Sequence, residues 1–383
     1  MWLTGRLTPD HKTIANFRKD NGKSIRNVCR QFVVLCQQLS FFTEALVAID
    51  GSKFKAVNNR DRNFTSAKLQ RRMEEIESSI NRYLTELDTA DRQEPAVAQA
   101  RSERLQDKIA TLKAQMKELQ AIEVQLNATP DKQISLTDPD ARSMKTRGTG
   151  IVGYNVQTAV DAKHHLIVAH EVTNIGIDRD QLSSMAKSAR AAMGVADLTV
   201  IADRGYFKGE EILACHEAGI HAIVPKTTTS GAKAAGRFDR ADFIYDAEKN
   251  EYCCPAGDHL IWRYASRQDG LLQNRYWSSN CQRCAIKEKC TPSTERRITR
   301  WEHEGVLMAM QNRLDHAPDS MRIRRQTVEH PFGTLKLWMG SAHFLTRTLD
   351  RVSTEMGLHV LAYNLKRVMK ILGNESLMEA MRA

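Results

Sequence analysis

The pattern of apolar residues predicts a set of short strands along the middle of the chain. Some segments are continuously apolar and others alternate, and each stops at a polar or turn residue, as buried or half-buried strands do. Tyr154–Val160 and Leu166–Val172 are separated only by a short polar turn and therefore predict a β-hairpin. The other strand segments are 45–50, 198–202 and 220–224.

Apolar residues three and four positions apart predict helices in the other parts of the chain. The first forty residues predict two helices, which either dock on DNA or simply pack against the rest of the protein. Further helices are expected over 178–193, 210–218 and 352–372. Strands and helices alternate along the chain, which predicts an α/β fold with a mixed sheet covered by helices.

The segment from Phe64 to Asn127 has a different pattern. Large apolar residues recur in alternating steps of mostly four and three with charged residues between them, and Asp88 to Pro95 interrupts the repeat. This pattern is typical of coiled coils, so we expect an antiparallel helical hairpin. The hairpin is either a plain scaffold or an arm for dimerisation, and both interpretations fit.

Composition and charge narrow the class of protein. The chain has 383 residues, 42% of them apolar and 27% charged, which is ordinary for a globular protein. A formal net charge of +10 suits a polyanion such as DNA. We expect a cytoplasmic protein with reduced cysteines, because the sequence has neither an apolar leader nor a long apolar run. No phosphate-binding Walker loop occurs, so no nucleotide cofactor is expected.

Two of the predicted strands end in an aspartate, Asp50 and Asp203. If the two strands are parallel neighbours, their spacing of about 4.8 Å brings both carboxylates together at the same edge of the sheet. Adjacent carboxylates repel each other unless a cation lies between them, and hard oxygen ligands suit Mg²⁺. The alternative is that each aspartate simply caps the turn after its strand.

A basic segment, Met321–Lys336, contains a single acid, Glu329. On a regular helix Arg325, Glu329 and Lys336 share one face. They form either a salt-bridged surface or a site where the acid binds metal and the bases hold DNA phosphates. Pro331 would break a helix interior, so we expect Glu329 in a first turn or at a kink.

Four of the eight cysteines are spaced like metal ligands. Cys254 is followed by Pro-Ala-Gly, Cys281 and Cys284 form a CxxC pair, and Cys290 lies six residues further on. Four thiolates in two loops can hold Zn²⁺ tetrahedrally, and the alternative is four reduced structural thiols. Cys253 is an ambiguous substitute for Cys254.

Four ordered motifs, VAIDGSKFKAV, GYNVQTAVDAKHHLIVA, IADRGYF and VEHPFGTLK, resemble those of bacterial insertion-sequence transposases of the DDE class. The IS-eleven-eighty-two branch, which is InsH-like, is the most similar. The resemblance implies a ribonuclease-H-like core with a catalytic triad, which falls on Asp50, Asp203 and Glu329. Of the related Tyr-Arg-Glu-Lys signature, Arg325, Glu329 and Lys336 are present, and Arg322 stands where the tyrosine is expected.

The resemblance also implies a function and its partners. We expect a transposase that uses two Mg²⁺ ions to cut and join DNA at the inverted repeats of its element and at a target, working as a homodimer or larger assembly near the nucleoid. Relatives carry a further helical segment before the stretch that resembles Met1–Asn21, so we expect a shortened N-terminus. That feature favours two alternatives, an inactive DNA-binding remnant or a nuclease that cuts without joining.

The resulting domain prediction places two insertions in a divided catalytic core. It comprises an N-terminal helical segment at 1–42, core at 43–60, the coiled-coil hairpin insertion at 61–130, core again at 131–235, a Cys-rich insertion at 236–300 and a catalytic helix with a helical tail at 301–383.

Overall fold

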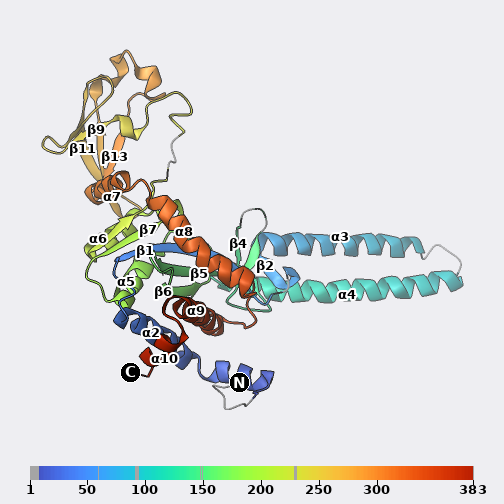
Figure 1. Cartoon of the computed structure of the whole chain (residues 1–383). Helices are drawn as coiled ribbons and strands as arrows, with labels where there is room; N and C mark the ends of the chain where they lie inside the picture. Colours follow the sequence, from blue (N-terminus) through green and yellow to red (C-terminus); the bar gives the residue numbers. More distant parts are fainter. Residues whose placement is uncertain are drawn as a thin grey trace.

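A computed structural model describes residues 8–58, 60–90, 95–146, 148, 150–227 and 231–382. Figure 1 shows a central sheet flanked by helices, a long helical hairpin that projects from one side and a smaller β-rich module at the other end. Within the described residues, no helix is both long enough and apolar enough to cross a membrane. The first residues of the predicted N-terminal segment, 1–7, lie outside the described part.

The central sheet is mixed and has six strands. Its middle order is β5–β1–β7–β8; β1 is antiparallel to β5 and parallel to β7, and β7 is parallel to β8. On its other edge β5 pairs with β4 and β6, both antiparallel. This order is consistent with a ribonuclease-H-like core. The strands are β1 Leu46–Lys55, β4 Arg142–Met144, β5 Ile151–Asp161, β6 Ile167–Thr173, β7 Leu198–Ala202 and β8 Ile220–Ile223.

The two faces of this sheet pack against different helices. Val47 and Ile49 of β1 join a cluster with α2, α5 and α6, whereas Ala48 between them joins a cluster with α8 and α9. Successive strand residues point to opposite faces, so Asp50 is expected on the same face as Ala48, toward α8. The helices are α1 His11–Asp20, α2 Gly22–Gln38, α5 Leu182–Met193, α6 Gly209–Glu217, α7 Glu304–His316, α8 Ser320–Gly333, α9 Leu349–Leu372 and α10 Asn374–Ala380.

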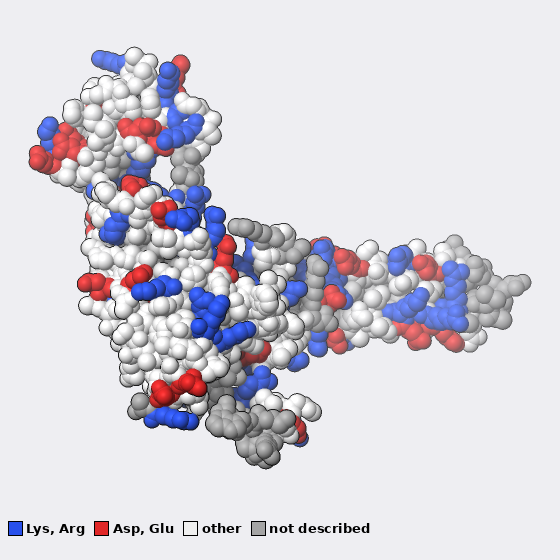
Figure 2. All heavy atoms as spheres, in the orientation of Figure 1, with Lys and Arg blue, Asp and Glu red and all other residues white. Residues whose placement is uncertain are grey.

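The projecting hairpin consists of α3 (Ser66–Ala90) and α4 (Pro95–Ala128), which lie side by side (Figure 1). Leu69 and Ile76 of α3 are buried against Leu119 and Leu126 of α4. At the base, β2 (Asn63–Thr65) pairs with β3 (Gln133–Ser135) and closes the hairpin. Figure 2 shows acidic and basic side chains interleaved along the hairpin, as expected for a solvated two-helix surface.

The β-rich module is a five-stranded sheet in the order β13–β12–β11–β10–β9, with antiparallel pairing throughout. It follows the central sheet along the chain and leads into α7. Its strands are β9 Ile244–Asp246, β10 Glu251–Cys253, β11 His259–Gln268, β12 Leu271–Trp277 and β13 Ile298–Trp301.

Helix α8 excludes one of the two positions expected for Glu329. The helix continues through Pro331 to Gly333, so Glu329 lies in its second half and not in a first turn. A π-helical turn, Thr334–Trp338, follows directly. Wider turns of this kind change the direction in which later side chains point and are frequent at functional sites.

Candidate active site

The register of the sheet places Asp50 beside Asp203. The last paired residues of the parallel strands β1 and β7 are Ile49 and Ala202, and each aspartate is the next residue along its strand. Asp203 has extended backbone, and its carboxylate accepts a hydrogen bond of 2.7 Å from the Gly205 amide. The predicted juxtaposition of the two carboxylates at one sheet edge therefore follows from strand pairing alone.

Arg324 of α8 lies against both carboxylates. Its Nη2 is 2.6 Å from Asp50 Oδ1 and 3.6 Å from Asp203 Oδ2. The Arg324 side chain is mostly buried, and within the described residues its Nε has no hydrogen-bond partner. The guanidinium therefore lies where a cation is needed to offset two neighbouring negative charges.

Burial raises the pKa of Asp50 to about 6. Arg324 opposes this effect, whereas the negative charges of Asp203 and Asp178 add to it. A carboxyl group whose pKa is raised by burial and by neighbouring acids holds its charge at a cost. Such groups concentrate at sites that bind cations or transfer protons.

A buried polar network supports the sheet behind Asp50. Asp178, in the loop after β6, accepts hydrogen bonds from Asn155 Nδ2 at 2.7 Å and from Gln157 Nε2 at 2.6 Å. The buried Tyr206 hydroxyl donates to Gln157 Oε1. Gly51 leaves room for this network, since a Cβ there would lie 2.3 Å from Gln157 Nε2 and 2.5 Å from Asp178 Oδ1.

Lys336 also lies beside this edge of the sheet. Its Nζ donates to Ser52 Oγ at 2.6 Å and to the Lys53 carbonyl at 3.0 Å, and it lies 4.5 Å from the centre of the Phe54 ring. Burial lowers the pKa of Lys336, while the charge of Asp50 acts in the opposite direction. The predicted basic residue is thus adjacent to the predicted acid.

Glu329 and Arg325 point elsewhere. Both are exposed, and Glu329 lines a surface hollow with Lys366, Arg367 and Lys370 of α9. Glu329 is five residues after Arg324, which on a helix corresponds to about 140° of rotation. The structure thus brings Asp50, Asp203 and Lys336 together and leaves Glu329 outside that group. Figure 2 shows basic side chains gathered where α8 and α9 cross the visible face of the core.

The cysteines predicted as zinc ligands lie in the β-rich module, away from the carboxylates (Figure 1). Cys254, Cys281, Cys284 and Cys290 line one cavity, and Cys253 is not among its lining residues.

The aspartates fit a divalent cation by their chemistry, since two neighbouring carboxylates already require a positive charge between them. Within the described residues, however, no three His, Cys, Asp or Glu side chains are arranged as a ready metal site. Besides Asp203, the acid that raises the pKa of Asp50 is Asp178 and not Glu329.

Sequence reasoning missed the roles of Arg324 and Asp178. Arg324 was one of several bases in its segment, and only the direction of α8 distinguishes it. Asp178 lies at the start of a predicted helix with no motif around it. Its link to Asp50 becomes visible only when β5 and β1 are paired.

A mixed sheet flanked by helices, with aspartates that follow the paired residues of adjacent parallel strands, is consistent with the ribonuclease-H-like class of folds. Residues 126–365 match the family described as Transposase DDE domain, and the chain belongs to that family. The family consists of enzymes that bind DNA and act in transposition with divalent metal ions. No curated protein and no solved structure matches the chain.

Proposed function

We propose that this protein is the transposase of an insertion sequence of the IS-eleven-eighty-two branch. It cuts DNA at the terminal inverted repeats of its element and joins the ends to target DNA. The observation that supports this proposal is the pair Asp50 and Asp203, placed side by side by strand register and bridged by Arg324.

The proposed catalytic acids are Asp50, Asp203 and Glu329, which would hold two Mg²⁺ ions. When bound, the metals supply an activated water or 3′-hydroxyl and stabilise the leaving 3′-oxygen. The protein's own part is to fix two carboxylates on rigid strands and to hold the DNA backbone. Lys336 lies at the same edge to bind a phosphate near the scissile bond, and the exposed Arg325 extends the basic surface along α8.

Arg324 has two successive roles in this proposal. Without metal it offsets the charges of Asp50 and Asp203, as in the structure. With metal and DNA present, the guanidinium turns from the carboxylates to the phosphate, for which its planar donors are well suited. Its buried Nε without a partner supports a second position for this side chain.

The identity of the third acid is the open part of the site. Glu329 matches the family signature. For its carboxylate to reach the aspartates, α8 would have to rotate about its axis, and a change in the π-helical turn that follows α8 could allow this rotation. Asp178 is near the aspartates already, but its Oδ1 is held by Asn155 and Gln157. We propose Glu329 as the ligand and Asp178 as the residue that positions the strands.

Single-turnover cleavage of DNA bearing the inverted repeats, with Mg²⁺ or EDTA, tests the assignment. We expect Asp50→Asn, Asp203→Asn and Glu329→Gln to reduce cutting to the EDTA level while DNA binding persists, because each removes a charge and little volume. Asp178→Asn should keep measurable cutting. Full activity of Asp203→Asn, or equal loss of binding and cutting, would contradict the metal role.

The position of Glu329 favours a second candidate, a DNA-binding remnant or a nuclease without strand transfer. If Glu329→Gln cuts as well as the unmodified protein and no joined product forms, the nuclease is correct. If the unmodified protein binds the repeats and never cuts them, the remnant is correct.

A further inference from the structure

The β-rich module has a small apolar core for an independent unit. From Phe243 to Trp301 the buried apolar cluster consists of a few side chains: Phe243, Tyr252, Leu260, Tyr276 and Ile298. Folded segments shorter than about 70 residues seldom obtain enough stability from apolar burial alone and commonly use a disulfide or a metal ion. All described cysteines here are free thiols.

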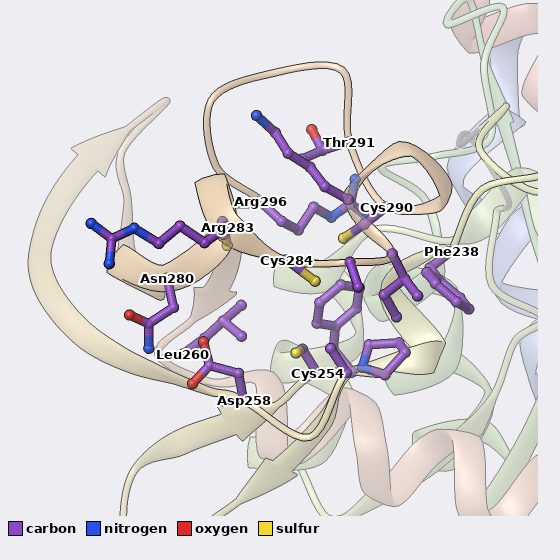
Figure 3. Close-up of a pocket in the computed structure, with 17 residues that line it drawn as sticks. Phe238, Cys254, Asp258, Leu260, Asn280, Arg283, Cys284, Cys290, Thr291 and Arg296 are labelled. Carbon is purple, nitrogen blue, oxygen red and sulfur yellow. The ribbon is translucent and has the colours of Figure 1, made fainter.

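Beside this core lies a cavity of about 570 Å³, the walls of which carry four thiols. Cys254 comes from the loop after β10, Cys281 and Cys284 from the turn after β12, and Cys290 from the loop before β13. Figure 3 shows the sulfur atoms of Cys254, Cys284 and Cys290 on the same side, facing the cavity. The β10–β11 loop and the β12–β13 connection thus place four thiols at one cavity.

Tight turns hold these thiols in position. The Gly257 amide donates to the Cys254 carbonyl at 2.8 Å, and the Cys254 amide donates to the Asp258 carbonyl at 2.9 Å. In the second loop the Cys284 amide donates to the Cys281 carbonyl at 3.3 Å. Short turns of this kind after a cysteine present its sulfur and the next one to a common centre.

The charges around the cavity suit a thiolate cluster. Arg283, Lys287 and Arg296 line the same cavity as the cysteines. Asp258 is the one carboxylate among the described lining residues. Four thiols, three basic groups and few carboxylates form a set that favours a soft dication.

We propose that Cys254, Cys281, Cys284 and Cys290 bind one structural Zn²⁺ that cross-links the loops of the β-rich module. Each thiol gives up a proton to solvent and forms one sulfur–zinc bond, and the site carries a net charge of about −2, which the three basic residues offset. The described thiols do not yet stand in ligand geometry. Zinc binding would therefore draw the four sulfur atoms, which line one cavity, closer together. This site is independent of the proposed catalytic function.

The test begins with the full chain, purified under reducing conditions from zinc-supplemented cells. Elemental analysis should give about one zinc per chain, and X-ray absorption should show sulfur ligands only, at about 2.3 Å. After removal of zinc, added Co²⁺ should produce the thiolate charge-transfer bands of a tetrahedral site. A zinc content near zero, or a first shell with nitrogen or oxygen, would overturn the proposal.

Serine variants add a matched comparison. Cys281→Ser and Cys290→Ser should lose zinc, whereas Cys253→Ser should keep it, because Cys253 lies in β10 and does not line the cavity. Equal zinc in all three variants, or equal loss in all three, would contradict the assignment. If the first two variants do not fold, the metal content and X-ray absorption of the unmodified chain still decide.

Discussion

The central sheet and the β-rich module differ in what stabilises them and in what holds their candidate site residues in place. In the sheet, apolar clusters on both faces surround the strands, and the strand register places Asp50 next to Asp203. In the module a few aromatic and aliphatic side chains support an antiparallel sheet, and two loops carry the four thiols that line its cavity. The backbone ladder thus fixes the position of the two aspartates, whereas in our proposal a bound ion fixes the position of the thiols.

In our proposals the central sheet carries the catalytic residues, and the thiol cluster stabilises the β-rich module. A carboxylate pair on a rigid sheet is costly to the fold, and in the proposed function it binds the metal ions. A thiol cluster in loops is useful to the fold and has no part in the proposed phosphoryl transfer. Substitutions in the two regions should therefore have different effects, and the following predictions are ordered by the expected size of the effect.

The largest effect is expected for Leu260→Ala in the module. Leu260 is only 1% exposed, and its truncation should cost about 2–5 kcal/mol through lost burial and a cavity. Because the module has its own small core, we expect amide hydrogen exchange to accelerate in β9–β13 and to remain slow in β1, β5 and β7. Hydrogen exchange followed by mass spectrometry measures both regions together.

The matched control is Leu198→Ala in β7, where the side chain is fully buried. This change should accelerate exchange throughout the central sheet. If Leu260→Ala loosens the central sheet as much as Leu198→Ala does, the two regions unfold as one unit and the comparison is wrong.

A smaller effect of opposite sign is expected for Asp50→Asn in metal-free protein. The pKa of Asp50 is raised from 3.8 to about 6 in the folded state, so the folded protein binds more protons than the unfolded chain between these values. The stability contributed by this group is therefore lost as pH rises from about 4 to about 6. Asn avoids the loss, and the variant should be more stable by up to about 3 kcal/mol at pH 7.

Denaturant titrations in EDTA at pH 4 and pH 7 measure this difference. The gain should nearly vanish at pH 4, and the exposed-site variant Asp197→Asn should show no comparable pH dependence. An Asp50→Asn protein that is less stable than the unmodified one at pH 7 would show that its pair with Arg324 outweighs burial.

The smallest effect is expected for Lys336→Ala. Loss of one phosphate contact should weaken DNA binding modestly and reduce the slope of log affinity against log salt by about one unit. Lys163→Ala is the control, since Lys163 pairs with Glu44 at the opposite end of β1. An unchanged slope for Lys336→Ala would remove that residue from the DNA surface.

The sequence predicted the carboxylate pair because its geometry is local to two strands. Apolar runs that end in Asp50 and Asp203 are visible in the sequence, and parallel pairing of β1 with β7 is enough to bring the two together. The mixed sheet flanked by helices could be predicted for the same reason. Strand periodicity and alternation with helices determine it.

The faces on which the side chains of α8 lie were harder to predict, because they depend on the number of residues in each helical turn. The expectation that Arg325, Glu329 and Lys336 share a face assumed uniform turns of about 3.6 residues. The π-helical turn Thr334–Trp338 changes that spacing, and of these three residues Lys336 is the one with a described hydrogen bond to β1. The contacts of Arg324 and Asp178 are tertiary, and no local pattern in the sequence predicts them.

The hairpin of α3 and α4 has a mechanical consequence. At about 1.5 Å per residue, the longer helix, Pro95–Ala128, extends roughly 50 Å from its base. The base of the hairpin is narrow: the short β2–β3 pair closes it, next to the internal contacts of Leu69 and Leu126. Because the hairpin is long and its base is narrow, a tilt of a few degrees at the base moves the far end by several ångströms.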